Sequence, residues 1–339
     1  MDTTTSVLGF ALPHPFIIGA SPLGWDLDAI RRLEDAGCAA IVLPSLFEEQ
    51  ITLEASGHIH HRDPFDPAWA TLLADYPSAD RYRLGPAEYA EHLSRVRRAV
   101  SIPVIASLNG TSAESWLTFS RILEQAGADA LELNLYELVT DLHVPSAAIE
   151  HETIEIVSQV KHYVKIPIAV KLSPFFAAFA NVALQLDEAG ADGLVIFNRF
   201  YQPDIDTGTM APIAKADLST SAELLLRLRW LAILHGRVRP SLVVTGGVST
   251  ADDAVKAVLA GADGIEVVSA ILRHGPRYLA LMRDGLERWM EAHCILRLRE
   301  VCGRCSLKQA PDPAAFERGN YIRALYSWTE ESVRADAKR

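Results

Sequence analysis

A lysine stands near the end of one of the most apolar stretches of the chain, and its charge must be balanced. The segment IPIAVKL, residues 166–172, is typical of a buried strand and carries Lys171 as its one charged residue. A buried ammonium is costly unless it meets an anion or an electron-rich acceptor. Glu132 could pair with it below a ligand, or a cofactor or substrate could be its partner. Lys171 is therefore a candidate catalytic and cofactor-binding residue.

A second candidate is the glycine pair in SLVVTGGVST, residues 241–250. Gly246 and Gly247 end a strand-like run and leave bare backbone, which lets N–H groups approach a phosphate. The N–H groups near Ser269 and Ala270, after the next strand, would complete the cradle. The alternative is a tight turn before a helix capped by Ser249 or Thr250.

Small and amide side chains stand at other strand ends. Asn134 lies two residues after Glu132 and shares its face of the strand. A ring of these side chains with Lys171 suits a flat heterocycle with polar edges, bound above a phosphate pocket. Flavin mononucleotide (FMN) fits this description better than a sugar phosphate does. The further members of the ring are Ala20, Ser21 and Asn198.

These residues need a scaffold that brings strand ends together, and a recurring phrase supplies it. LEDAGCAAIVL, LEQAGADALEL, LDEAGADGLVI and VLAGADGIEV each join the end of an amphipathic helix to an apolar run through an Ala-Gly stop. Proline-introduced strands alternate with them. Eight β-then-α units predict an α/β fold of the (β/α)8 barrel type. The expected strands lie near residues 15, 39, 102, 130, 166, 193, 241 and 264.

The spacing of the strands is uneven. Insertions after strand two, at about 46–101, and after strand six, at about 199–239, are expected to cover the substrate, because loops after barrel strands build the active face. No boundary suggests a second domain, so we expect one domain over residues 1–339, with the barrel at about 6–290. The extension at about 291–339 is expected to pack helices against the barrel or a second subunit.

Charge and composition exclude some classes of protein. The 339 residues carry a net charge of −11, which argues against a nucleic-acid partner. No run approaches the roughly 20 apolar residues of a membrane helix, so we expect a cytoplasmic protein that does not enter a membrane.

Two groups of potential metal ligands carry less weight. The loop GHIHHRD has three histidines, and Cys294, Cys302 and Cys305 fall one short of a four-thiolate site. We therefore predict no metal.

Six segments in order, GASPLG, LELNL, VKLSPFF, FNR, TGGVST and GADGIEVVSAIL, resemble the flavin-binding barrel of the dihydroorotate dehydrogenase family, particularly its soluble class 1 branch. The resemblance implies that Lys171 faces the pyrimidine edge of the isoalloxazine ring, where a cation stabilises negative charge on the reduced flavin. The phosphate ligands it implies are Gly246, Gly247, Ser269 and Ala270.

The chain departs from that family at two places. Class 1 enzymes read Asn-Leu-Ser-Cys-Pro-Asn after strand four, with the cysteine as base, whereas this chain reads NLYELV. Glu137 takes the place of the cysteine and Val139 that of the last asparagine. After strand two the family shows Thr-Lys-Ser, and this chain retains only Ser45, a further candidate for cofactor binding. A glutamate serves as a general base when its pKa is raised, although a surface position for Glu137 is an open alternative.

The sequence thus predicts an FMN-dependent oxidoreductase that acts on a CH–CH bond, with dihydroorotate to orotate, a step of pyrimidine biosynthesis, as the leading reaction. One alternative is a different small substrate on the same barrel. Another is a phosphate-binding lyase or isomerase that uses Lys171 as a Schiff-base amine. A homodimer and an electron-transfer partner protein are both compatible with the sequence.

Overall fold

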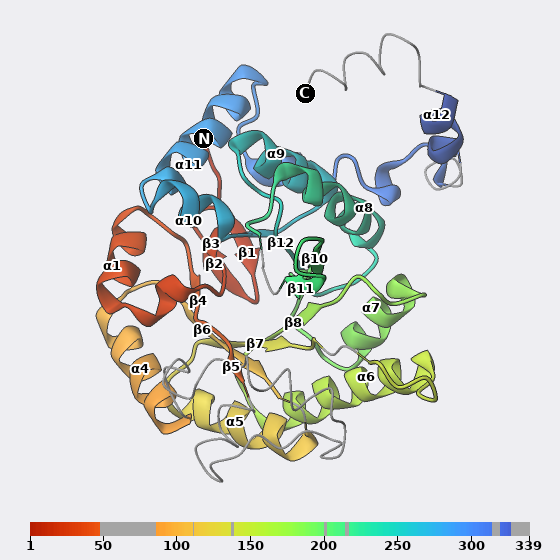
Figure 1. Ribbon diagram of the computed structural model, residues 1–339. Coiled ribbons are helices and arrows are strands. Elements are labelled where there is room, and N and C mark those ends of the chain that lie inside the picture. The colour runs from red at the N-terminus through yellow and green to blue at the C-terminus, as the bar shows by residue number, and fades with distance from the viewer. Residues whose placement is uncertain are drawn as a thin grey trace.

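Eight parallel strands close into a barrel in the computed structural model, which describes residues 1–47, 86–110, 112–136, 139–199, 202–213, 217–313 and 319–326 (Figure 1). Each strand pairs with its neighbours in order, and β4 also pairs with β6, which closes the ring. The predicted (β/α)8 fold is confirmed, and each barrel strand lies within a few residues of its predicted position. The barrel strands are β3 (Phe16–Ile18), β4 (Ile41–Val42), β6 (Val104–Asn109), β7 (Ala130–Asn134), β8 (Ile168–Leu172), β9 (Gly193–Ile196), β12 (Ser241–Thr245) and β13 (Gly264–Val267).

Helices surround the barrel, and the Ala-Gly phrase explains how several of them end. Gly37, Gly127, Gly190 and Gly261 all have positive φ angles, between 84° and 117°, a backbone conformation that side chains with a Cβ rarely adopt. Each glycine therefore stops a helix and turns the chain into the next strand. The helices are α1 (Leu27–Asp35), α4 (Pro86–Ala99), α5 (Ala113–Gln125), α6 (Ser146–Tyr163), α7 (Phe179–Glu188), α8 (Leu224–Leu234), α9 (Ala251–Ala260), α10 (Ser269–His274), α11 (Tyr278–Ala292) and α12 (Asn320–Tyr326).

The barrel interior has a lower, apolar layer near the amino ends of the strands. Alternate residues of a strand point to the same side, so Ile105, Ala130, Ala169 and Val243 meet inside the ring. An N-terminal hairpin of β1 (Thr5–Val7) and β2 (Phe10–Leu12) contacts this layer through Val7, Leu8 and Leu12. The hairpin therefore closes the lower end of the barrel.

The second and larger core lies between the outer face of the barrel and the helices. It contains Phe16, Leu131, Val170 and Leu194 from the strands, packed with helix residues such as Leu186. Strand residues that face this core alternate with those that face the interior, which explains why most barrel strands read as continuous apolar runs.

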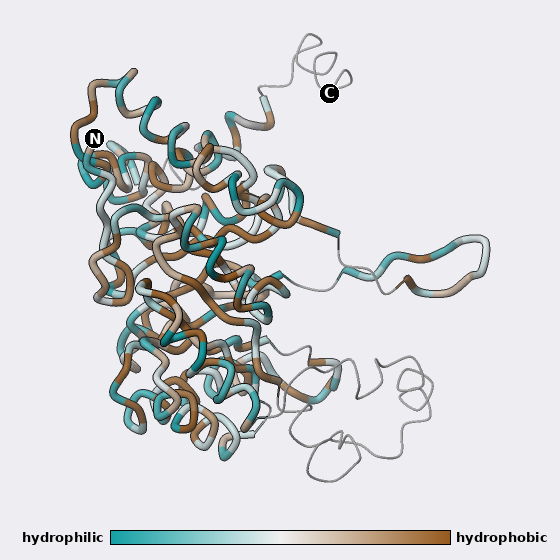
Figure 2. Tube along the Cα trace, turned by 90° about the vertical axis from the view of Figure 1, so that its left-hand side faces the viewer, coloured by the Kyte–Doolittle hydropathy of each residue, from teal (hydrophilic) through white to brown (hydrophobic). Residues whose placement is uncertain are grey.

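The two predicted insertions have different outcomes. Most of the first, residues 48–85, lies outside the described residues, while its last part is the barrel helix α4. The second contains an exposed hairpin of β10 (Asp204–Asp206) and β11 (Ala211–Ile213) that projects from the barrel (Figure 2). This hairpin stands on the same side as the carboxyl ends of the strands, as expected for a segment that follows β9.

The C-terminal extension, at about 291–339, was expected to pack helices against the barrel or a second subunit. The segment after α11 donates backbone hydrogen bonds from Gly303 to Val258 (2.9 Å) and from Cys305 to Leu259 (2.8 Å), both at the end of α9. In α12, Tyr321 and Tyr326 are exposed. That residues 1–339 form one domain stays a prediction. None of the described helices is long and apolar enough to cross a bilayer.

Candidate active site

The upper layer of the barrel interior is polar, although the same strands build it. Two residues beyond Ala130 on β7 stands Glu132, and two beyond Ala169 on β8 stands Lys171. Glu266 holds the matching position on β13, two residues after Gly264. Residues two apart on a strand face the same side, so these three residues lie above the apolar layer and also point into the barrel. The upper layer therefore contains three charged side chains.

Lys171 lies between the two carboxyl groups. Its Nζ is 3.1 Å from Glu132 Oε1 and 3.2 Å from Glu266 Oε2, and all three side chains are at most 8% exposed. The ion pair with Glu132 that the sequence suggested is therefore present. The second carboxylate was missed, although an acidic residue inside the apolar run of strand eight is the same signal that marked Lys171.

These contacts keep Lys171 charged. Burial alone would lower its pKa, but the two carboxylates outweigh burial and raise the pKa above its usual value. Burial raises the pKa of Glu132 to about 8, repulsion from Glu266 adds to this rise, and the Lys171 ammonium opposes it. The cluster therefore contains Lys171 in its charged form beside the Glu132 carboxyl group, which retains its proton more strongly than an ordinary glutamate does.

An amide and hydroxyl network lies on one side of this cluster. Asn198 donates to Asn134 Oδ1 at 2.7 Å, and Asn134 Nδ2 lies 3.5 Å from Ser45 Oγ. Ser45 in turn shares a hydrogen bond of 2.7 Å with Ser107, whose hydroxyl donates to Glu132 at 3.2 Å. The structure thus brings together Ser45, Asn134 and Asn198, all predicted from the sequence, and connects them to the charged cluster.

The backbone of the loop after β12 requires glycine at two positions. Gly246 and Gly247 have φ angles of 80° and 83°, and a Cβ on Gly247 would lie 2.4 Å from the backbone nitrogen of Leu224 in α8. Thr250, not Ser249, caps the following helix α9 through a reciprocal bond with Asp253. The glycines therefore let the loop pack closely against α8, as the tight-turn alternative requires.

Hydrogen-bond donors nevertheless gather beside this loop. The Gly247 N–H donates to Ser219 Oγ at 3.1 Å, and Ser219 donates to Ser269 Oγ from its backbone (3.0 Å) and its hydroxyl (2.9 Å). Ser219, which the sequence did not single out, bridges the loops after strands seven and eight. It lies in the insertion after strand six, and no motif marked it.

Two arginines add positive charge near these donors. Arg227, only 3% exposed, donates to the backbone carbonyls of Thr245 and Glu223, the latter at 2.7 Å. The Arg199 guanidinium lies 3.7 Å from Glu223. Sequence reasoning missed both arginines. The FNR segment contains Arg199, whereas Arg227 is one of two arginines on an otherwise apolar helix.

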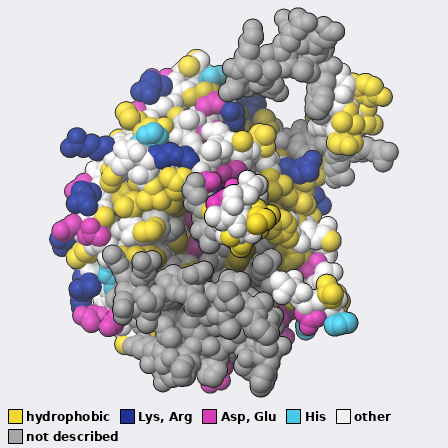
Figure 3. Space-filling view, in the orientation of Figure 1, with side chains coloured by type: hydrophobic (Ala, Val, Ile, Leu, Met, Phe, Trp, Pro, Cys, Tyr) yellow, Lys and Arg dark blue, Asp and Glu magenta, His cyan; other side chains and the backbone are white. Residues whose placement is uncertain are grey.

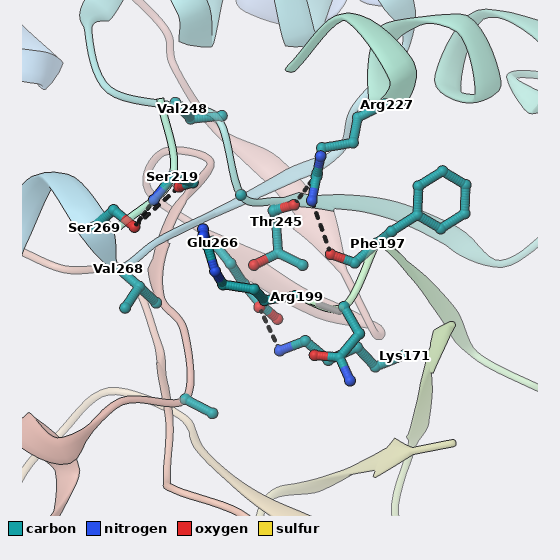
Figure 4. A pocket seen from close by; sticks show the side chains of 13 residues that line it. Lys171, Phe197, Arg199, Ser219, Arg227, Thr245, Val248, Glu266, Val268 and Ser269 are labelled. Carbon is teal, nitrogen blue, oxygen red and sulfur yellow. Dashed lines mark hydrogen bonds and ion pairs between the residues drawn. The ribbon is translucent and has the colours of Figure 1, made fainter. Parts of the chain in front are cut away.

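One pocket connects the charged cluster to these donors (Figure 4). Lys171 and Glu266 line one part, and Ser219 and Ser269 line another. Hydrophobic side chains gather around the middle of this face, next to the projecting hairpin (Figure 3). Five predicted site residues line the pocket, namely Ala20, Lys171, Asn198, Gly246 and Ser269.

Other predicted residues stand outside the pocket lining. Ala270 is 1% exposed and packs in the outer core, because it follows Ser269 on the inward side of α10. Ser21 is buried, and within the described residues its hydroxyl has no hydrogen-bond partner. The predicted base, Glu137, lies outside the described residues.

A sequence model described as dihydroorotate dehydrogenase matches residues 83–290, more than half of the chain. The chain belongs to the dihydroorotate dehydrogenase family. The predicted relationship is confirmed, and the chain is accordingly a dehydrogenase.

Relatives of this dehydrogenase are similar over nearly its whole length. The dihydroorotate dehydrogenase B (NAD(+)) catalytic subunit of Methanothermobacter thermautotrophicus is 28% identical over 316 residues, 88% of this chain and 97% of that protein. The protein of the same description from Thermoplasma acidophilum is 26% identical over 311 residues, 89% and 98% of the two chains. The NAD-dependent dihydropyrimidine dehydrogenase subunit PreA of Escherichia coli K12 is 25% identical over 321 residues, 89% and 76%.

Membership in the dihydroorotate dehydrogenase family disfavours the lyase alternative. A Schiff-base lysine must lose its proton to act as a nucleophile, and a lowered pKa is how such lysines are activated. The carboxylates around Lys171 raise its pKa instead. Both observations favour a cation that acts by its charge.

As for metals, Cys294, Cys302 and Cys305 are free cysteines, and His58, His60 and His61 lie outside the described residues. Among the residues that the structure describes, no group of three or more His, Cys, Asp or Glu side chains is placed to hold a metal ion.

Proposed function

We propose that this dehydrogenase binds FMN in the pocket and oxidises a small cyclic amide at a CH–CH bond, with dihydroorotate as the leading substrate. The observation that carries the proposal is the continuity of one pocket from the cation Lys171 to the donors around Ser219 and Ser269. A phosphorylated flavin needs both ends, since its ring gains negative charge on reduction and its phosphate is anionic.

The residues present fit such a group. The Gly247 N–H and the hydroxyls of Ser219 and Ser269 now bond to one another, and a phosphate could accept from them in place of those bonds. Arg199 and Arg227 supply positive charge to the same pocket. The buried Ser21 hydroxyl, at the end of β3, has no hydrogen-bond partner within the described residues. An unpaired buried hydroxyl is costly, so a ligand that bonds to it would gain affinity.

When bound, FMN supplies the hydride acceptor. The protein's own part is to hold and orient the groups around it. The Lys171 ammonium is held in a fixed position, because the carboxyl groups of Glu132 and Glu266 both contact it. Asn198 and Asn134 orient one another through their 2.7 Å hydrogen bond, and their remaining donors and acceptors are available for the polar edge of a heterocycle.

The proton removed from substrate needs a base, and we assign that role to Glu137. The support is its place in the sequence, three residues after Asn134, where class 1 enzymes carry their catalytic cysteine. A carboxylate can remove a proton next to a carbonyl group when its surroundings raise its pKa toward the working pH.

Dihydroorotate is favoured by the names of the relatives, while the local sequence favours a related ring. Val139 stands where the family's last asparagine would be, and it is 36% exposed. The relationship to a dihydropyrimidine dehydrogenase subunit makes a 5,6-dihydropyrimidine without a carboxylate the second candidate. Because relatives are described as subunits, we also propose an electron-transfer partner protein.

Anaerobic reduction of the bound flavin tests this assignment. The purified protein is mixed with dihydroorotate, or with dihydrouracil, and loss of the flavin's visible absorption is followed by stopped flow. We expect one substrate to bleach the flavin and Glu137→Gln to slow bleaching by at least about 10²-fold while FMN stays bound. Rapid bleaching in Glu137→Gln would contradict the role of Glu137, and no bleaching by either substrate would contradict the substrate class.

A further inference from the structure

The cluster around Lys171 contains one more acidic group than its cation can neutralise. Glu132 comes from β7, Lys171 from β8 and Glu266 from β13, and all three are buried in the upper layer of the barrel. If both carboxyl groups were ionised, the cluster would carry a net negative charge in a poorly solvated place, and such like charges are not tolerated close together.

The hydrogen bonds of Glu132 indicate that one of its oxygens carries or shares a proton. Glu132 Oε1 accepts from Lys171 and Ser107, whereas the buried Glu132 Oε2 has no partner within the described residues. A buried carboxylate oxygen without a donor is costly. A proton held between Glu132 and Glu266 removes this cost and the repulsion together. Such an arrangement resembles other pairs of carboxyl groups that titrate as a unit.

Neighbouring charged and titratable groups do not provide an alternative neutraliser. Arg227 on α8 is engaged with backbone carbonyls, and Arg199 after β9 lies near Glu223. Tyr89 on α4 donates its hydroxyl to the carbonyl of Pro44 at 2.8 Å. Lys171 is therefore the cation in direct contact with the two carboxyl groups among the described residues.

We propose that Glu132 and Glu266 share one proton, so that they form a charge-neutral cluster with Lys171, and that loss of this proton sets an upper pH limit for tight cofactor binding. The first part stands on the cluster alone, and the second rests on the proposed FMN function. Release of the proton to solvent leaves one additional negative charge in the wall of the pocket, since Glu266 lines it. The pKa of Glu132, raised to about 8 by burial, places this release at mildly alkaline pH.

Infrared spectroscopy of the purified protein tests the shared proton without reference to flavin. Between about pH 6 and about pH 10, we expect a protonated-carboxyl C=O band that disappears with a midpoint near pH 8. Glu132→Gln and Glu266→Gln should each abolish this band, because the carboxylate that remains is neutralised by Lys171 alone. Since the two variants make the same prediction, one that fails to fold leaves the other.

Asp263→Asn is the matched control. Asp263 is another largely buried carboxyl group whose pKa is raised, chiefly by burial, but it accepts a hydrogen bond from Leu242 N away from the cluster. The band that titrates near pH 8 should persist in this variant. Absence of the band in the wild-type protein, or its persistence in both glutamine variants, would overturn the shared proton.

FMN affinity at about pH 7 and about pH 9 tests the second part. We expect wild-type binding, followed by quenching of FMN fluorescence, to weaken of the order of tenfold on going to the higher pH, as one added charge near an anionic ligand would produce. Both glutamine variants should lose this dependence. A flat wild-type profile despite a titrating infrared band would overturn the pH limit. A protein with the band but no FMN affinity would instead contradict the proposed function.

Discussion

The lower and upper layers of the barrel interior differ sharply in chemistry, although residues only two positions apart on the same strands build them. On β7 the step from Ala130 to Glu132 passes from an apolar core to a buried charge, and on β8 the step from Ala169 to Lys171 does the same. The lower layer is closed by the N-terminal hairpin, whereas the upper layer borders the pocket. The comparison teaches that one end of the barrel supplies stability so that the other can hold costly polar groups.

Removal of the cation should give the largest effect. Lys171→Met leaves two buried carboxyl groups without their partner, and we expect a loss of about 3–5 kcal/mol in the free energy of unfolding, measured by urea denaturation. The matched control is Lys161→Met, which breaks a half-buried pair with Asp192 and should cost under about 1 kcal/mol. Equal losses in the two variants would contradict the claim that the buried carboxyl groups of the upper layer depend on Lys171.

The lower layer should respond through packing alone. Leu12→Ala removes a side chain that is 3% exposed at the closed end, and we expect a loss of about 2–5 kcal/mol in unfolding free energy. The FMN content of the folded protein should stay unchanged. Leu281→Ala, at a leucine that is 59% exposed, should stay within about 0.5 kcal/mol. Loss of FMN from folded Leu12→Ala protein would show that the two layers are not independent.

A buried histidine at the amino end of β3 should make the fold sensitive to acid. His14 bonds to the Gly37 carbonyl at 2.7 Å and accepts from Phe16 N at 3.3 Å, and burial, with a contribution from Arg283, lowers its pKa to about 4. Between about pH 6.5 and about pH 4 the unfolded chain binds a proton that the folded chain does not. The unfolding free energy should therefore fall by up to about 1.4 kcal/mol per pH unit as the pH decreases.

Glutamine substitutions separate this effect from general acid sensitivity. His14→Gln should remove that part of the slope in denaturation curves recorded across the same range. His151→Gln, at an exposed histidine, should leave the slope as it is. An unaltered slope in His14→Gln would mean that other groups cause the acid sensitivity.

The helix cap beside the glycine loop should give the smallest effect. Thr250→Ala removes the side-chain acceptor of the Asp253 N–H, and we expect a loss of about 1 kcal/mol in unfolding free energy, measured by thermal denaturation. Thr250→Ser keeps the acceptor and should recover most of this loss. A loss as large as that of Lys171→Met would contradict this ranking, because it would mean that the cap stabilises the fold as strongly as the buried cation does.

The strands were predictable because each joint is encoded locally. The Ala-Gly phrase requires a left-handed glycine, and the positive φ angles at Gly37, Gly127 and Gly190 are the structural reason for its recurrence. Lys171 was predictable for a similar reason, since a charge inside an apolar strand needs a partner. Closure of the barrel followed from the count of eight units.

The parts of the site that could not be predicted depend on contacts between segments that are far apart in the sequence. Ser219 meets Ser269 only because the insertion after strand six folds back over strand eight, and no local pattern encodes that approach. Glu266 could have been found by the reasoning applied to Lys171, but its pairing with a residue 95 positions away required the barrel to be closed. The roles predicted for Glu137 and for the FMN-binding residues stay predictions.

The visible spectrum of the purified protein tests the central claim most directly. We expect a yellow protein that releases FMN, not FAD, on denaturation, because the donors around Ser219 and Ser269 gather at one place and suit a single phosphate. Chromatography of the released flavin against both standards identifies it. A colourless protein that takes up no FMN on reconstitution would contradict the claim that this pocket binds a flavin.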